Sequence, residues 1–159
     1  EGPLREACIK FVETREREGQ NLKNDLLEKL DGLAKMVERV QKRSPEVVAA
    51  YREKLETKVH ELLEDNQIDE SRIAAEVILF SDKICNDEET VRLLSHIRGM
   101  QKILSEKEGV GRKLDFMAQE MNREANTILS KSSDLEISDI AIDLKTEIEK
   151  IREQIQNIE

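Results

Sequence analysis

The sequence predicts an all-α protein: a long antiparallel helical hairpin, residues 1–68, followed by a smaller helical bundle, residues 69–159, that ends in a heptad-patterned helix. Three observations support this fold class. The 159 residues include only two Pro and six Gly, so few positions interrupt a helix. Apolar residues recur at steps of three and four, the period of an amphipathic helix. Aromatic residues are scarce, with no Trp, one Tyr and three Phe, so the core must consist mainly of Leu, Ile, Val and Ala.

The first helix is predicted from about residue 4 to residue 42. Its apolar stripe consists of Leu22, Leu26, Leu30, Leu33, Val37 and Val40. Ser44 and Pro45 suit the N-cap and the first position of a new helix, so a second helix is expected to begin there and to run to about residue 63. Such a hairpin cannot bury its stripe alone. We therefore expect it to pack on another subunit or on a region outside this chain.

Two further helices are predicted after the hairpin. Asp69 is expected to cap the first of them, which holds the apolar residues up to Phe80. Asn86 and Glu89 have the spacing of a capping box, and this pattern predicts a helix through Ile103.

The last two helices carry the most regular patterns. Gly109 and Gly111 precede a helix whose predicted buried stripe is Leu114, Met117, Ala118, Met121, Ala125, Ile128 and Leu129. This stripe leaves five polar side chains in register on another face: Arg112, Asp115, Gln119, Asn122 and Asn126. Ser133 and Glu136 have capping-box spacing before the final helix, which carries Ile137, Ala141, Leu144, Ile148, Ile151, Ile155 and Ile158 at heptad steps and so favours helix pairing.

Charge is distributed unevenly along the chain. The formal net charge of −9 opposes binding of a phosphate backbone to the chain as a whole. Residues 134–159 contain eight acids and three bases, whereas residues 109–131 contain three acids and four bases. A nucleic acid is therefore expected to contact the second of these segments. Two isolated Cys and the lack of a long apolar run predict a reduced, cytoplasmic protein with no membrane segment.

A signature segment stands out within residues 109–132. It contains Gly109–Phe116, Gln119-Glu120, Asn122–Thr127 and Ser130–Ser132, an ordered string of amides, carboxylates and cations on one helix. Asn is a poor helix former, so two Asn on a helix suggest a polar site. The segment resembles the signature of the YicC/YloC family of bacterial stress-associated endoribonucleases. The resemblance extends to Glu88-Glu89, Arg92-Leu93, Ser95-His96 and the terminal Lys150–Glu159, but in residues 1–68 only to Arg15–Gly19 and the leucine pattern.

The resemblance implies more than this chain contains. Family members carry a further N-terminal region of mixed secondary structure, so we interpret the chain as the C-terminal portion of a longer protein. Members assemble as hexameric rings, and they cut RNA. One departure concerns the residues before Glu88-Glu89, where the family often has an acid and this chain has Cys85-Asn86. A metal ligand is therefore not assigned there.

Four residues are candidates for the chemistry. Glu120 and Glu124 lie one helical turn apart, so their carboxylates could hold a divalent cation, manganese or magnesium; the alternative is surface ion pairs, such as Glu120 with Arg123. Glu76 stands among apolar residues and is expected to be partly buried beside a cation or metal, or in an ion pair with Arg72. His96 could transfer protons, although a lone helical His is more often structural.

RNA contacts are expected from cations and amides. The candidate cations are Arg72, Arg92, Arg112, Lys113, Arg123 and Lys131, and the candidate amides are Gln119, Asn122 and Asn126. The alternative for each cation is an ion pair within a helix. Because aromatic residues are so few, recognition through the RNA backbone and shape is expected rather than base stacking.

Two functional hypotheses follow. In the first, the chain is the C-terminal part of an endoribonuclease that cleaves structured RNA with a divalent metal: Glu120 and Glu124 bind the metal, Glu76 supports it and His96 moves a proton. In the second, the chain is a non-catalytic helical module that oligomerises and grips RNA, and the catalytic groups lie elsewhere in the protein.

Overall fold

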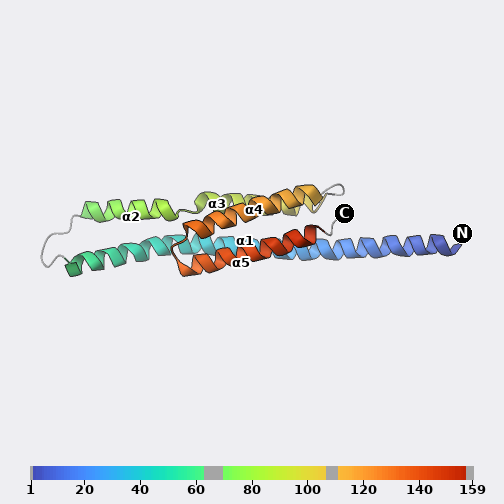
Figure 1. Cartoon of the computed structure of the whole chain (residues 1–159), viewed down its shortest axis with the longest axis horizontal. Coiled ribbons are helices and arrows are strands. Elements are labelled where there is room, and N and C mark those ends of the chain that lie inside the picture. The colour runs from blue at the N-terminus through green and yellow to red at the C-terminus, as the bar shows by residue number, and fades with distance from the viewer. Residues whose placement is uncertain (1, 63–69, 107–110, 157–159) are drawn as a thin grey trace.

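The computed structural model describes residues 2–62, 70–106 and 111–156. These residues form five helices and no strand: α1 Gly2–Leu62, α2 Glu70–Ile84, α3 Asp87–Ile103, α4 Gly111–Lys131 and α5 Leu135–Ile155. The predicted all-α class is confirmed. Figure 1 shows an elongated molecule in which α1 runs along the whole length and the other helices lie beside it.

Helix α1 continues through Pro45, so the predicted break at Ser44 and Pro45 is wrong. Proline removes one backbone hydrogen bond from a helix interior. The side chain of the neighbouring Ser44 donates to the carbonyl oxygen of Val40 at 2.9 Å, but this bond does not replace the one that the carbonyl oxygen of Gln41 loses. The heptad spacing through Val40, Ser44 and Val47 is unbroken, and Val40 and Val47 are both buried. Burial of one continuous stripe against the neighbouring helices therefore outweighs the local cost of proline.

An antiparallel helical hairpin does exist, but its second arm is α2. The C-terminal part of α1 and α2 lie side by side beyond the end of the bundle (Figure 1). The rings of Tyr51 and Phe80 stack with centroids 3.7 Å apart, and the Tyr51 hydroxyl donates to the Glu76 carboxylate at 3.3 Å. Residues 63–69, including the predicted cap Asp69, lie outside the described residues.

The middle of α1 forms a four-helix bundle with α3, α4 and α5. Helix α4 packs on α3 and α5, and α1 packs on the same two helices from the other side. One apolar core fills the bundle; its fully buried large side chains are Leu26, Leu30, Leu33, Leu93, Ile97, Met100, Leu114, Met121, Ile128, Leu144, Ile148 and Ile151. The core thus joins helices from both predicted parts of the chain, 1–68 and 69–159.

The heptad stripe of α5 is buried inside this bundle. The predicted core positions from Ile137 to Ile155 are all buried, and the helix packs against α4 and α1 of the same chain. Ile158 lies outside the described residues. The heptad pattern from Ile137 to Ile155 is therefore explained by packing within the chain.

The caps of α3 and α5 differ from the predicted capping boxes. Asn86 is the N-cap of α3, but its side chain makes no capping hydrogen bond. Asp134, not Ser133, caps α5 and accepts from the backbone N–H of Ile137 at 3.1 Å. The carboxylate of Asp134 also meets an arginine of α1, a contact that no spacing within the α4–α5 turn could predict.

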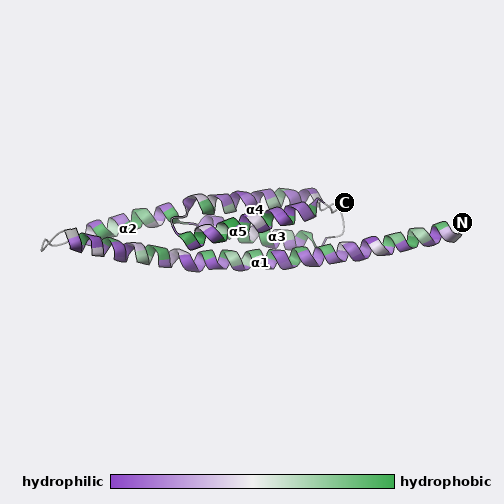
Figure 2. Ribbon diagram, turned by 60° about the horizontal axis from the view of Figure 1, so that its bottom comes forward, coloured by the Kyte–Doolittle hydropathy of each residue, from purple (hydrophilic) through white to green (hydrophobic). Residues whose placement is uncertain are grey.

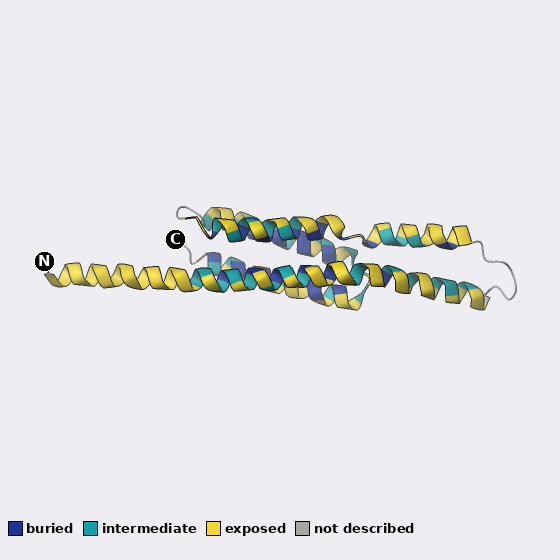
Figure 3. Cartoon of the chain, turned by 180° about the vertical axis from the view of Figure 1, so that it is seen from behind, coloured by how far each residue is buried: buried dark blue, intermediate teal, exposed yellow. Residues whose placement is uncertain are grey.

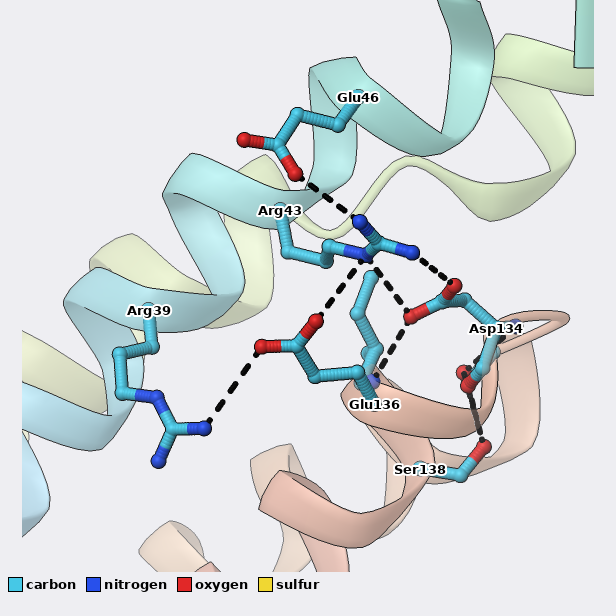
Figure 4. Close-up of polar contacts among 8 residues, drawn as sticks. Arg39, Arg43, Glu46, Asp134, Glu136 and Ser138 are labelled. Carbon is cyan, nitrogen blue, oxygen red and sulfur yellow. Dashed lines mark hydrogen bonds and ion pairs between the residues drawn. The ribbon is translucent and has the colours of Figure 1, made fainter. Parts of the chain in front are cut away.

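Arg43 joins α1 to the start of α5, as Figure 4 shows. Its guanidinium donates to both oxygens of Asp134, at 2.9 and 3.3 Å, and to Glu46 at 3.0 Å. Glu136 lies 3.4 Å from Nε of Arg43, and Arg39 reaches the other oxygen of Glu136 at 3.7 Å. This cluster fixes the α4–α5 turn to the middle of the long helix. The hydrogen bonds from Arg43, assisted by the Ile137 N–H and opposed by burial, lower the pKa of Asp134.

Replacing Asp134 with Asn should destabilise the protein by about 1 kcal/mol at pH 7, because Asn keeps the cap but loses the charge that binds Arg43. A lowered pKa in the folded state gives stability that is present above the unfolded-state pKa, about 3.9, and is lost as pH falls through the folded-state value. The difference between wild type and variant should therefore shrink below about pH 4. Urea unfolding at pH 7 and pH 3 measures this. The control is Asp139→Asn, at an exposed site on α5 with no ion pair to the described residues. A stability difference between wild type and Asp134→Asn that is equal at pH 7 and pH 3 would contradict a stabilising charge interaction between Asp134 and Arg43.

The first third of α1 has no covering helix among the described residues. Residues 2–21 are exposed throughout, including the large apolar side chains Leu4, Ile9, Phe11 and Val12. Figure 3 shows this arm as a continuous exposed stretch that extends past the bundle, and Figure 2 shows apolar residues along it. None of the helices in the described ranges combines the length and the apolar character of a membrane span.

Candidate functional site

Helix α4, which carries the signature segment, presents three different sides. Its core side is the predicted stripe: Leu114, Ala118, Met121, Ala125 and Ile128 are buried, and Met117 and Leu129 are half-buried. A second side faces α3. The third side is directed away from the core and borders α5; we call it the outer row, and it consists of Arg112, Phe116, Gln119, Arg123, Asn126 and Ser130.

The side facing α3 holds a network of charges that we call the α3–α4 seam: Glu89, Arg92, Glu124 and Lys131. The Lys131 ammonium donates to the Glu89 carboxylate at 2.8 Å and to the Cys85 carbonyl oxygen at 3.1 Å. Nε of Arg92 lies 2.9 Å from the Glu124 carboxylate. Arg92 also pairs with Glu88 and lies 3.7 Å from Glu89.

The two central carboxylates of the seam are buried. Only 3% of Glu89 and 6% of Glu124 is exposed, and an isolated carboxylate at such a place would be costly. Burial alone would raise the pKa of Glu89, but the hydrogen bond from Lys131 and the charges of Lys131 and Arg92 outweigh burial and lower it. One Glu89 oxygen, Oε2, and Oδ1 of buried Asn86 have no hydrogen-bond partner among the described residues. The seam is thus a set of mutually neutralised charges at the helix interface.

The seam also fixes the register of α3 against α4. Arg92 meets Glu124, and seven residues further along α3 Gly99 approaches Met117, seven residues earlier on α4. The two helices are therefore antiparallel, and His96 and Glu120, which lie one turn inward from each contact, stand at the same level. Both side chains are half-buried, and neither has an ion pair with another described residue. The register thus places three of the four predicted catalytic residues, His96, Glu120 and Glu124, along the interface of α3 and α4.

The metal site stays a prediction, and one of its two carboxylates has another partner. The carboxylate of Glu124 is engaged by Arg92, which matches the ion-pair alternative for this residue. Within the described ranges, no three His, Cys, Asp or Glu side chains are grouped so that they could hold a metal ion. Glu120 makes no ion pair with Arg123, so its carboxylate is available as one oxygen ligand for a metal ion.

The outer row lines a groove between α4 and α5. One hollow of about 500 Å³ is lined by Gln119, Asn122, Arg123, Asn126, Thr127, Ser130 and Arg152. A second, of about 790 Å³, is lined by Gly111, Arg112, Asp115, Phe116, Gln119, Ile155 and Gln156. Both hollows are shallow and largely open to solvent, and they share Gln119 in their lining; we call them together the α4–α5 groove. Its lining has three Arg and one Asp, a net charge of +2 on a chain of −9.

Hydrogen bonds position the polar lining of this groove. Asp115 accepts from Gln119 at 2.7 Å and from Arg152 of α5 at 3.0 Å, and the pair with Asp115 raises the pKa of Arg152. The Asn122 amide donates to Glu149 of α5 at 2.7 Å, and its Oδ1 has no partner in the described part of the chain. The predicted polar face of α4 therefore exists, and part of it holds α5 in place.

The candidate cations differ in their availability. Arg92 and Lys131 belong to the seam, and Lys113 lies 4.0 Å from Glu106. Arg112 and Arg123 are exposed and make no ion pair with the rest of the described chain. Of the predicted cations, these two are the ones that lie in the α4–α5 groove.

Glu76 and Arg72 lie apart from α4. Both are exposed on α2, which packs on α1 beyond the end of the bundle (Figure 1). The predicted burial of Glu76 is wrong: its apolar neighbours Ile78 and Leu79 are themselves exposed, since among the described residues α2 packs mainly on α1. Glu76 instead accepts a hydrogen bond from Tyr51, and this carboxylate raises the pKa of Tyr51 together with burial, the larger cause.

Three residues of the site were not predicted from the sequence. Glu89 was assigned to a cap, and its role in the seam depends on Lys131, which is 42 residues away. Arg152 lies in the acidic terminal segment, yet it lines the groove. Phe116 is 62% exposed within the groove, although large apolar residues on a helix are expected to face the core. Its position on the helix face opposite the stripe from Leu114 to Met121 is the sequence feature that predicts its exposure.

Comparisons with known proteins place these features in a family. Residues 40–159 match the family described as "Endoribonuclease YicC-like, C-terminal". A protein of Clostridioides difficile named "Probable endoribonuclease YicC" is 47% identical over 157 residues, which cover 98% of this chain and 54% of that protein. A protein of Haemophilus influenzae with the same name is 41% identical over 151 residues, covering 94% of this chain and 51% of that protein. The chain spans about half the length of these curated relatives.

Proposed function

Because this chain belongs to the family of YicC-like endoribonucleases, we propose that it is the RNA-binding part of an endoribonuclease. Its residues 40–159 correspond to the C-terminal part of that family. RNA lies along the α4–α5 groove in this proposal. The observation that carries it is the presence of two arginines without an ion pair to the described residues, Arg112 and Arg123, in a groove of positive charge on an otherwise acidic chain. Phosphates are attracted to such a groove and repelled by the acidic faces around it.

Cleavage is proposed at the level of Glu120 and His96. Glu120 follows Phe116 by four residues and precedes Arg123 by three, so it lies next to the outer row on the α4 surface. Glu120 lines neither hollow, so RNA in the groove would have to extend across the outer row toward α3 to reach its carboxylate. Glu120 and His96 are the types of side chain that transfer protons in phosphodiester cleavage, whereas Glu124 acts on the site by holding Arg92. The need for manganese or magnesium stays a prediction, as does the cutting of structured RNA.

The N-terminal arm of α1 favours the second hypothesis, an oligomerising and RNA-gripping module. Its exposed Leu4, Ile9, Phe11 and Val12 have no covering helix within the described residues. An apolar stretch of this kind suits packing on another copy of the protein or on a region outside this chain. Assembly as a hexamer stays a prediction. The two hypotheses share the RNA groove and differ in whether this chain supplies the catalytic groups.

The groove is tested by replacing Arg112 and Arg123 with Gln in the full-length protein. The double variant should bind a labelled RNA hairpin roughly tenfold more weakly. The slope of log Kd against the logarithm of the salt concentration should decrease by about two, because each lost phosphate contact lowers it by about one. Fluorescence anisotropy at several salt concentrations measures both quantities. Neither arginine supports the fold through an ion pair with the described residues, so the unfolding midpoint should not change.

The matched control removes the same charge elsewhere. Lys35 and Arg98 are exposed on α1 and α3, and the double change of both to Gln should leave the affinity close to that of wild type. Equal losses in the two double variants would show that net charge, rather than the groove, determines RNA binding, and would reject the proposal.

A further inference from the structure

Phe116 is an exposed aromatic side chain in the middle of a charged groove. It is 62% exposed and lines the same hollow as Arg112 and Gln119. A single exposed apolar residue is common on protein surfaces and has no meaning by itself. The position of Phe116 among its neighbours is what suggests a function. Arg112 stands one turn before it on the outer row, Gln119 one turn after it, and Arg123 two turns after it.

The spacing of these residues suits a single strand of RNA. At the helical rise of 1.5 Å per residue, Arg112 and Arg123 are roughly 16 Å apart along α4, with Phe116 between them. Two cations that flank an aromatic ring can hold phosphates on both sides of a base that lies on the ring. In a duplex, each base is already stacked between its neighbours, so the ring has no free base face to contact.

We propose that Phe116 stacks on an unpaired base of the RNA, so that the α4–α5 groove selects single-stranded nucleotides, such as those of a loop, over duplex RNA. This inference rests on the proposed function and adds the substrate class. Arg112 and Arg123 supply affinity through phosphates, while the ring supplies the preference for unpaired nucleotides. The site therefore combines backbone contacts with one stacking contact.

The alternative partner of the exposed Phe116 ring is a protein surface, either on a second copy of the chain or on another region of the protein. The hollow that Phe116 lines also contains Ile155, but the adjoining hollow is lined by arginine, amide and hydroxyl groups alone, and this favours RNA. Phe116 is the one aromatic side chain among the described residues that line the two hollows. An apolar interface would instead be expected to contain several aromatic or aliphatic side chains. The experiment separates the two occupants.

The direct test uses Phe116→Trp as a fluorescent probe. The 159 residues contain no Trp, so in a full-length protein whose remaining Trp, if any, are changed to Phe, the new indole is the sole such fluorophore. Addition of a short unstructured single-stranded RNA should quench its emission, and a duplex of the same sequence should leave it nearly unchanged. Phe11→Trp on the N-terminal arm is the matched control, since Phe11 is 63% exposed and lies beside Arg15.

A pair of variants measures the contribution to binding. Phe116→Leu keeps an apolar side chain but no ring, and should weaken binding of the single strand roughly tenfold while binding of the duplex is unchanged. Phe116→Tyr keeps the ring and should bind like wild type. A Phe116→Leu protein that binds both RNAs with wild-type affinity, or a Phe116→Trp emission that bound RNA does not quench, would overturn the inference.

The outcome for this inference can be separated from the outcome for the proposed function. If the arginine double variant loses affinity but RNA does not quench the emission of the Phe116→Trp protein, RNA lies in the groove without stacking, and only the inference fails. If neither the arginine variant nor the Phe116 variants alter RNA affinity, the proposed function fails as well. If Phe116→Leu changes the oligomeric state measured by light scattering and leaves RNA affinity unchanged, the ring belongs to a subunit contact and the inference is rejected.

Discussion

Replacing Pro45 with Ala should stabilise the protein by about 2 kcal/mol. Proline in a helix interior is about 3 kcal/mol less favourable than Ala, because it removes one hydrogen bond and its ring crowds the preceding turn. Pro45 lies within α1 and is exposed, so Ala can replace it without a loss of core packing. The new N–H would donate to the carbonyl oxygen of Gln41 in the ordinary helical pattern. The midpoint of urea unfolding measures the change, and circular dichroism reports the helix content.

The sign of this effect distinguishes the continuous helix from a hairpin. If a new helix began at Ser44, Pro45 would occupy the first helical position, where proline is favoured, and Ala would be neutral or slightly destabilising. The reciprocal change, Ala49→Pro at an exposed site one turn further along α1, should cost roughly 3 kcal/mol. A Pro45→Ala protein that is less stable than wild type would contradict the fold of α1 described above.

Replacing Glu120 with Gln should reduce RNA cleavage at least a hundredfold while RNA binding and the unfolding midpoint stay at wild-type values. A side chain that transfers a proton in the reaction contributes roughly a hundredfold to ten-thousandfold, and Gln keeps the shape of Glu without this capacity. The fold should tolerate the change, since Glu120 makes no ion pair with another described residue. Cleavage of an end-labelled RNA hairpin by the full-length protein, with manganese, with magnesium and with EDTA, provides the measurement.

Glu124 must be tested separately from Glu120. Its carboxylate is buried and holds Arg92, so Glu124→Gln should lower the unfolding temperature, and a loss of cleavage in this variant would reflect damage to the α3–α4 seam. Glu38→Gln, at an exposed site on α1, is the control for loss of one negative charge. Cleavage that survives in Glu120→Gln would show that Glu120 does not transfer a proton in the reaction, and would favour the hypothesis of an RNA-gripping module.

Periodicity was sufficient to predict the local structure of α3, α4 and α5. The buried stripes of α4 and α5 follow directly from apolar steps of three and four, because each of these helices packs on two neighbours in the bundle. Ser44 and Pro45 match the local signals of a helix start, but the longer apolar pattern outweighs them. The heptad positions Val40, Ser44 and Val47 cross the proline without a shift, and this continuity agrees with the long helix, whereas the residue types at the proposed turn do not.

The candidate site was predictable only in part, because side-chain pairing between helices is not encoded in local spacing. The polar face of α4 was visible in the sequence, and it does line the α4–α5 groove. The pairing of Glu89 with Lys131 depends on the antiparallel register of α3 and α4, which no local motif specifies. Glu76 shows the reverse case: apolar neighbours predicted burial, but α2 has too few packing partners to bury them.

The length of α1 has a mechanical consequence. Its 61 residues span roughly 90 Å as one helix, and the uncovered first third extends about 30 Å from the bundle. A helix without a break bends little, so this arm acts as a lever that is continuous with one wall of the bundle. A tilt of about 10° at the bundle would move the tip of the arm by about 5 Å over that length. Any body that holds the tip therefore also sets the direction in which the α4–α5 groove points.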